Sequence, residues 1–137
     1  MRRSRPRASA RILIVDDEES IVEFADKVLR VAGYETMTAT SGDAALKACE
    51  KEGLPDLLLT DVKMPRMEGD ELAARLRQLD PDLKVLYLTG YADQLFKNKP
   101  MLWAGEAFLE KPCTIDGLLE AVSLLLNGHG TAQRLDT

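Results

Sequence analysis

Successive apolar residues dominate four short segments of the chain, at residues 11–15, 57–61, 84–89 and 107–110. Short runs of this kind are typical of β-strands that are buried on both faces of a parallel sheet. Residues 35–40 predict a fifth strand, because threonine recurs there and is favoured in strands. The run at residues 57–61 ends on a carboxylate and is followed by turn signals at Pro65 and Gly69. We expect this strand to deliver Asp61 to the edge of a sheet.

The spacing of apolar residues changes to every third or fourth position after each of these strands, which predicts amphipathic helices. Ser41 and Thr114 are the expected N-caps of two of the helices, and Pro100 weakens the pattern of another. The helices are predicted near residues 20–32, 42–52, 69–79, 93–105 and 115–126. Five strands alternating with five helices predict an α/β fold, a flavodoxin-like doubly wound five-stranded parallel sheet with strand order 2-1-3-4-5.

Four of the predicted strands end on residues that carry chemistry. Asp16 and Asp17 follow the first strand, Asp61 the third, Thr89 the fourth and Lys111 the fifth. The carboxyl ends of parallel strands meet at one edge, so these side chains are expected around a single crevice. A cluster of carboxylates suits a hard cation such as Mg²⁺. Asp61 is then placed to be a nucleophile in phosphoryl transfer, with Lys111 and Thr89 contacting phosphoryl oxygens.

Composition and charge fit a single soluble domain of 137 residues with a net charge of −5. Four arginines lie within residues 1–10, and the remainder carries a net charge of −9, which argues against nucleic acid as a direct partner. No apolar run approaches the roughly 20 residues that a membrane helix needs. Cys49 and Cys113 show no metal-binding spacing and are expected to be thiols in a reducing cytoplasm. We therefore expect a cytoplasmic protein with no membrane association.

The sequence resembles the receiver domain of two-component response regulators over about residues 10–127. The resemblance is carried by four motifs: ILIVDDE at residues 12–18, LLLTDVKMPRMEG at 57–69, LYLTG at 86–90 and FLEKP at 108–112. Residues 1–9, which carry the four arginines, are expected to be a basic, disordered leader or linker remnant, and residues 128–137 a polar tail. The resemblance implies a receiver domain at residues 10–127. It also implies a domain that is not an enzyme in its own right but assists its own aspartyl phosphorylation and dephosphorylation.

The resemblance assigns a role to each residue of the crevice. Asp61 would be the phosphoacceptor, while Thr89 and Lys111 would sense the phosphoryl group. Phe108 takes the position of the family's aromatic switch, where it lacks the hydroxyl of the more frequent tyrosine. The Lys111–Pro112 bond would be cis, and Mg²⁺ would be held by Asp16, Asp17, Asp61 and the backbone carbonyl of Lys63.

The resemblance also implies the partners. A sensor histidine kinase or a phosphotransfer protein would supply the phosphoryl group. Residues 93–105 have the weakest helical pattern and should rearrange most easily, so we place the output face on helix 4 (residues 93–105), strand 5 (107–110) and helix 5 (115–126). The sequence does not identify the output partner that would bind there. Leu102 and Trp103 are apolar residues of that face that a partner could bury; the alternative for Trp103 is that it packs on the domain's own core. The domain would be a monomer or a weak dimer, either standing alone or forming part of a larger regulator or hybrid kinase.

Three other classes of protein are alternatives to a phosphorylated receiver domain. A haloacid-dehalogenase-type phosphatase would have a second aspartate two residues after the nucleophile, where this chain has Lys63. A nucleotide- or flavin-binding module would have a glycine-rich turn after the first strand, where this chain has four acids. A receiver-like scaffold that is never phosphorylated would be expected to have lost an acid, the threonine or the lysine, and none is lost here.

Overall fold

A computed structural model describes residues 10–90 and 105–127 of the chain. Five parallel strands form one sheet in the order β2-β1-β3-β4-β5, which confirms the predicted topology. The strands are β1 (Arg11–Val15), β2 (Glu35–Ala39), β3 (Leu57–Thr60), β4 (Lys84–Thr89) and β5 (Glu106–Glu110). All four residues of β3 are buried, as a run of apolar residues in the middle of a covered sheet requires.

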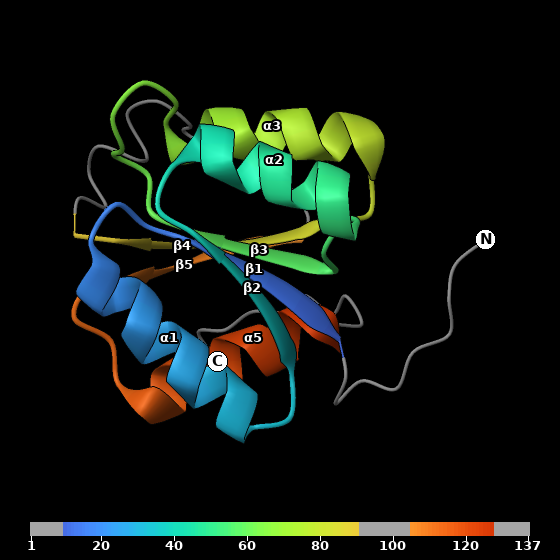
Figure 1. Cartoon of the computed structure of the whole chain (residues 1–137). Helices are drawn as coiled ribbons and strands as arrows, with labels where there is room; N and C mark the ends of the chain where they lie inside the picture. The colour runs from blue at the N-terminus through green and yellow to red at the C-terminus, as the bar shows by residue number, and fades with distance from the viewer. Residues whose placement is uncertain (1–9, 91–104, 128–137) are drawn as a thin grey trace.

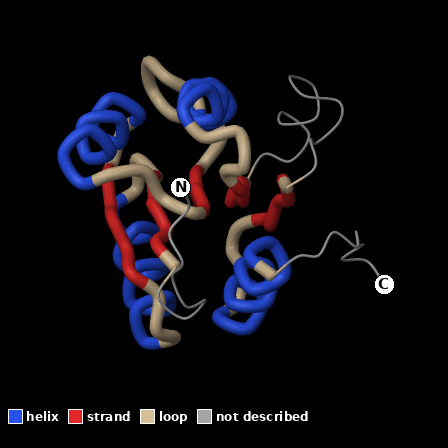
Figure 2. Tube along the Cα trace, turned by 90° about the vertical axis from the view of Figure 1, so that its right-hand side faces the viewer, coloured by secondary structure: helices blue, strands red, loops and turns tan. Residues whose placement is uncertain are grey.

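Helices cover both faces of the sheet, as Figure 1 shows, with α2 and α3 on one face and α1 and α5 on the other. Figure 2 views the same layers after a turn of 90°. The described helices are α1 (Glu19–Val31), α2 (Gly42–Glu52), α3 (Gly69–Leu79) and α5 (Ile115–Leu126). None of them is long and apolar enough to cross a membrane.

The ends of the helices follow local sequence signals. The Ser41 hydroxyl accepts a hydrogen bond from the N–H of Ala44, and the Thr114 hydroxyl accepts one from the N–H of Gly117, so both predicted N-caps are confirmed. Helix α1 differs from the prediction, because it begins at Glu19 with Glu18 as an N-cap that makes no side-chain capping bond. The acidic side chain of Glu19 stabilises the first turn instead, because it lies near the positive end of the helix dipole.

The core consists of two clusters, one on each side of the sheet. Residues of β1 alternate between them: Leu13 and Val15 pack with α2 and α3, and Ile12 and Ile14 pack with α1 and α5. This alternation follows from the two-residue period of a strand. Because both faces are covered, polar side chains gather where the strands end.

Strand β5 lies at the edge of the sheet and is fixed at both ends. At its start, Arg77 of α3 forms an ion pair of 2.8 Å with Glu106, whose side chain is fully buried. Just beyond its end, the Lys111 N–H donates a hydrogen bond of 2.9 Å to the Thr89 carbonyl of β4. These contacts set the position from which the Lys111 side chain extends.

Several sequence-based predictions fall on residues outside the described ranges. These are the helix at residues 93–105 with Leu102 and Trp103, the basic leader at residues 1–9 and the tail at residues 128–137. The helix 4 part of the expected output face lies there as well.

Candidate functional site

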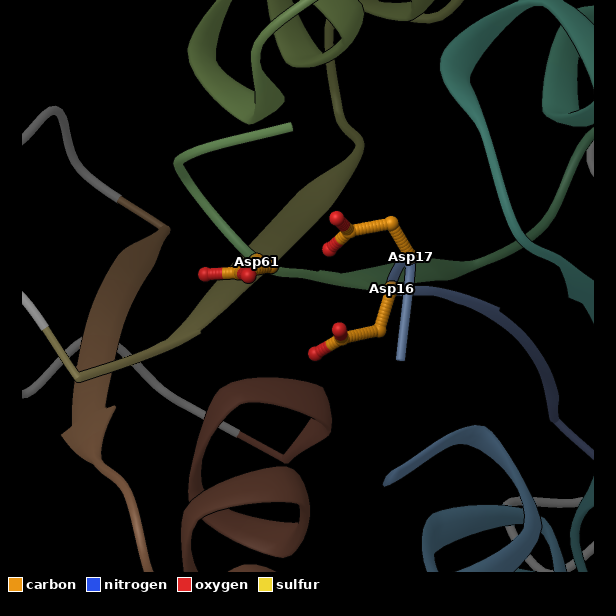
Figure 3. Close-up of side chains that lie close together, drawn as sticks. All are labelled: Asp16, Asp17 and Asp61. Atoms are coloured by element: carbon orange, nitrogen blue, oxygen red, sulfur yellow. The ribbon is translucent and has the colours of Figure 1, made fainter. Parts of the chain in front are cut away.

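Three aspartates lie together at the carboxyl ends of β1 and β3 (Figure 3). Val15 pairs with Thr60 in the sheet, so Asp16 and Asp61, which follow these residues, lie on neighbouring strands. Asp16, Asp17 and Asp61 each offer a carboxylate oxygen, and these oxygens lie within 4.8 Å of one another. Asp16 and Asp61 are buried, with 2% and 6% of their surface exposed, whereas Asp17 is exposed.

The backbone around Asp61 is held on both sides. Its N–H donates a hydrogen bond to the Val15 carbonyl of β1 at 3.1 Å, and its Oδ1 accepts one from the Val62 N–H at 2.7 Å. The Gly69 N–H donates to the Val62 carbonyl at 2.8 Å, which brings the first residue of α3 against the end of β3. A Cβ at Gly69 would clash with the Asp61 carbonyl oxygen, so this close approach requires glycine. The sequence indicated only a turn at Gly69, because nothing local reveals this contact.

Lys111 reaches across the edge of the sheet to the aspartates. Its Nζ lies 3.0 Å from Asp16 Oδ2 and 3.3 Å from Asp61 Oδ2, which are the two buried carboxylates of the cluster. It also lies 3.1 Å from Oε1 of Glu18, an exposed residue that the sequence did not single out as functional. The acid one position after the Asp16–Asp17 pair was visible in the sequence, but its distance from Lys111 follows only from the fold.

Burial and charge shift the pKa values of these groups in opposite directions. Burial raises the pKa of Asp61 above 3.8, against the lowering effects of the Lys111 charge and the Val62 N–H. Burial likewise raises the pKa of Asp16. Burial alone would lower the pKa of the Lys111 ammonium, but Asp16, Glu18 and Asp61 raise it above its usual range. Lys111 is therefore a permanent positive charge at this edge at neutral pH.

The donor set fits a hard divalent cation. All three aspartates offer oxygen ligands, and Mg²⁺ takes one or two carboxylates together with waters and phosphate oxygens. Asp16 Oδ2 is buried and accepts no hydrogen bond of good geometry, although it is ion-paired with Lys111. A buried carboxylate oxygen in this state still has capacity for a further ligand.

Thr89 ends β4, which pairs with β3, and Phe108 lies within β5, which pairs with β4. Thr89 is fully buried at the end of β4, and its carbonyl accepts the Lys111 N–H. Phe108 is half-buried in β5, opposite Tyr87 of β4, and packs against the core cluster on the α2–α3 side of the sheet. The peptide bond between Lys111 and Pro112 is cis, as the resemblance implied.

Lys63 follows Asp61 by two residues, and its side chain pairs with Glu68. Lys63 Nζ lies 3.5 Å from Glu68 Oε2, and both side chains are partly exposed. The loop between β3 and α3 that carries both residues is anchored by the buried side chains of Met64 and Met67. The roles that the resemblance assigned to the Lys63 carbonyl, Thr89 and Phe108 stay predictions.

Comparison with known proteins shows the family. The model of the response regulator receiver domain matches residues 12–123. The response regulator receiver protein CpdR of Brucella abortus is 42% identical over 116 residues, which cover 85% of this chain and 96% of CpdR. The structure of the response regulator TrrA of Thermotoga maritima, in complex with Mg²⁺ and BeF, superposes with a TM-score of 0.73 at 36% identity and covers 85% of this chain and 98% of TrrA. The chain belongs to the response regulator receiver domain family.

The same similarity occurs inside much longer proteins. The sensor kinase CckA of Brucella abortus is 34% identical over 119 residues, which cover 86% of this chain but only 13% of CckA. Family membership and the similarity to response regulators make this chain a phosphoacceptor domain of two-component, phosphorelay signalling.

Proposed function

We propose that Asp61 accepts a phosphoryl group from a sensor histidine kinase or a phosphotransfer protein. The observation that carries this assignment is the convergence of Asp16, Asp17, Asp61 and Lys111 at the carboxyl ends of β1 and β3 in a chain of the receiver family. An oxygen of the Asp61 carboxylate attacks phosphorus as the phosphorus–nitrogen bond of a phosphohistidine breaks. The electron pair of that bond goes to the histidine ring, and the product on Asp61 is an acyl phosphate.

The residues around Asp61 prepare it for this step. The Val62 N–H, 2.7 Å from Oδ1, fixes the direction of the carboxylate, and the Lys111 charge opposes the effect of burial on its pKa. The ionised carboxylate of Asp61 is the form that acts as a nucleophile. Lys111, a point charge 3.3 Å from Oδ2, is placed to contact an oxygen of the transferred group.

Asp16, Asp17 and Asp61, together with the Lys63 carbonyl, are the residues that would hold Mg²⁺. The ion supplies positive charge that offsets the negative charge of the transferring phosphoryl oxygens. Asp16 contributes a buried oxygen with spare capacity, and Asp17 contributes an exposed one next to solvent.

In this proposal, Thr89 and Phe108 change conformation when Asp61 is phosphorylated. The Thr89 hydroxyl contacts the phosphoryl group, and Phe108 turns into the space that the hydroxyl leaves. Burying the rest of a phenylalanine ring contributes about 1.5–3 kcal/mol at most, which shifts a population without changing the fold. The output partner binds the face to which strand β5 and helix α5 contribute.

Mass spectrometry after incubation with acetyl phosphate and Mg²⁺ tests the assignment. The wild type is expected to gain one phosphoryl group and Asp61→Asn none, because an amide is not a nucleophile. Asp43→Asn is a matched control, since it removes an exposed carboxylate from the first turn of α2 and should leave phosphorylation unchanged. Equal phosphorylation of Asp61→Asn and wild type would show that another residue accepts the group.

A further inference from the structure

The three carboxylates around the Lys111 ammonium differ in exposure. Those of Asp16 and Asp61 belong to side chains that are 2% and 8% exposed, whereas the side chain of Glu18 is 61% exposed. The three oxygens lie 3.0–3.3 Å from Nζ. Glu18 and Asp61 accept hydrogen bonds from the ammonium, and Asp16 is ion-paired with it without a hydrogen bond of good geometry, so three carboxylates compete for one cation. A phosphoryl oxygen that contacts Lys111 competes with these carboxylates for the ammonium.

We propose that Glu18 is a positioning residue for phosphorylation, which holds Lys111 in the unphosphorylated protein and releases it to the phosphoryl group. This inference rests on the proposed function of Asp61 and Lys111. It assigns a role to a residue outside the set of Asp16, Asp17, Asp61, Thr89 and Lys111.

Glu18 is the contact that is least costly to exchange. Releasing Asp16 would leave a buried carboxylate without its cation, which is strongly unfavourable. Released Glu18 turns into water, where an exposed carboxylate is well solvated. The Asp61 carboxylate bears the phosphoryl group itself, so the Lys111 N–H that points to it is already directed towards the incoming oxygens.

The backbone fixes the point from which the Glu18 side chain extends. Its N–H donates a hydrogen bond of 2.9 Å to Asp16 Oδ1, and its carbonyl accepts hydrogen bonds from Ile21 and Val22 in the first turn of α1. The start of the side chain therefore stays within reach of Lys111. Glu18 and the phosphoryl group compete for the Lys111 ammonium.

The competition predicts a measurable difference. When Glu18 is replaced by glutamine, the unphosphorylated state loses an ion pair that the phosphorylated state does not contain. An ion pair with one exposed partner stabilises a protein by an amount that corresponds to about 1.5- to 5-fold in an equilibrium constant. Glu18→Gln should therefore bind a phosphate mimic tighter by about this factor.

A general loss of negative charge near the site would also favour an anionic ligand, and Glu19→Gln controls for this effect. Glu19 is the next residue in the chain, is exposed in the first turn of α1, and forms no ion pair in residues 10–90 and 105–127. It gives the same change of charge at nearly the same place without a contact to Lys111.

The experiment titrates beryllofluoride into the wild type, Glu18→Gln and Glu19→Gln at saturating Mg²⁺ and follows backbone amide NMR signals around Asp61. We expect Glu18→Gln to bind about 1.5- to 5-fold tighter than the wild type and Glu19→Gln to match the wild type. In metal-free protein, the Nζ and Cε resonances of Lys111 should shift in Glu18→Gln and stay in place in Glu19→Gln.

The outcomes separate this inference from the proposed function. The role of Glu18 would be overturned if Glu18→Gln and Glu19→Gln bound beryllofluoride with equal affinity, or if the Lys111 resonances did not shift in Glu18→Gln. Either result would leave Asp61 as the proposed acceptor. Absence of binding to the wild type at saturating Mg²⁺ would overturn the proposed function and this inference with it.

Discussion

Replacing Asp61 by asparagine is expected to make the metal-free protein more stable, although it removes the proposed phosphoacceptor. The Asp61 carboxylate is buried beside two other acids, and burial raises its pKa, so the folded protein holds this charge at a cost. Asparagine keeps an oxygen for the hydrogen bond from the Val62 N–H and removes the charge. The substitution therefore isolates the electrostatic cost of the cluster.

The distances set the magnitude of the effect. The carboxylate oxygens lie within 4.8 Å of one another, and at an effective dielectric constant of about 20 two unit charges at this limiting distance repel by about 3.5 kcal/mol. Asp16 and Asp17 together therefore oppose the Asp61 charge by about 7 kcal/mol. Lys111 at 3.3 Å attracts it by about 5 kcal/mol on the same scale. Solvent around exposed Asp17 screens part of the difference. The expected gain in the free energy of unfolding is about 1 kcal/mol, or about 3–5 °C in Tm for a domain of this size.

Thermal and urea unfolding in the presence of a chelator measure this gain at neutral pH. Asp43→Asn serves as control, because it removes an exposed charge from α2 and should not stabilise the protein. Millimolar Mg²⁺ should raise the Tm of the wild type by mass action and raise that of Asp61→Asn less. The reasoning is refuted if Asp61→Asn unfolds at or below the wild-type temperature without metal, or if the wild type ignores Mg²⁺.

The pH dependence of the same proteins has a definite sign. Burial raises the pKa values of Asp16 and Asp61 above 3.8, so the folded state binds these protons more tightly than the unfolded state. The contribution of these two groups to metal-free stability should therefore increase as the pH falls from their raised pKa values towards 3.8. The charged groups that face them are Asp17, Glu18 and Lys111. Asp61→Asn should show a smaller change over this pH range than the wild type.

Two further substitutions test the loop between β3 and α3. Gly69→Ala should lower the free energy of unfolding by about 1–3 kcal/mol and slow phosphorylation, because the added Cβ would push against the Asp61 carbonyl. Urea unfolding measures the loss of stability, and an unchanged free energy of unfolding would contradict the close packing. Lys63→Ala should speed loss of the phosphoryl group about twofold, because a cation at the edge of the site is removed together with its pairing to Glu68. Decay of the phosphorylated protein measures this rate, Lys47→Ala on α2 is the control, and a slower or equal decay would assign Lys63 no role.

The fold and the cluster of acids followed from local patterns. Runs of successive apolar residues predicted the covered strands, and right-handed crossovers left few strand orders, of which the expected one makes β1 and β3 neighbours. Once that order is given, Asp16 and Asp61 must meet, although 44 positions of sequence separate them. Chain connectivity alone therefore placed these residues.

The contacts that the sequence did not predict depend on side-chain reach and on close packing. Glu18 looked like one more acid at the start of a helix, and only the crossing of Lys111 from β5 gives it a partner. Gly69 looked like a turn residue, and only the entry of α3 shows that its missing Cβ makes room for the backbone of Asp61. Both contacts join residues from separate elements, so no local period or propensity encodes them.

The residues of the proposed site follow both a central strand and an edge strand of the described sheet. Asp61 follows β3, which is hydrogen-bonded to strands on both sides, whereas Lys111 follows β5, which in the described sheet pairs only with β4. The Lys111 N–H and the Thr89 carbonyl form a hydrogen bond at the end of that single pairing, so a displacement of one backbone pulls on the other. The proposed nucleophile thus follows a strand that is paired on both sides, and its cationic partner follows a strand that is paired on one side only within the described sheet.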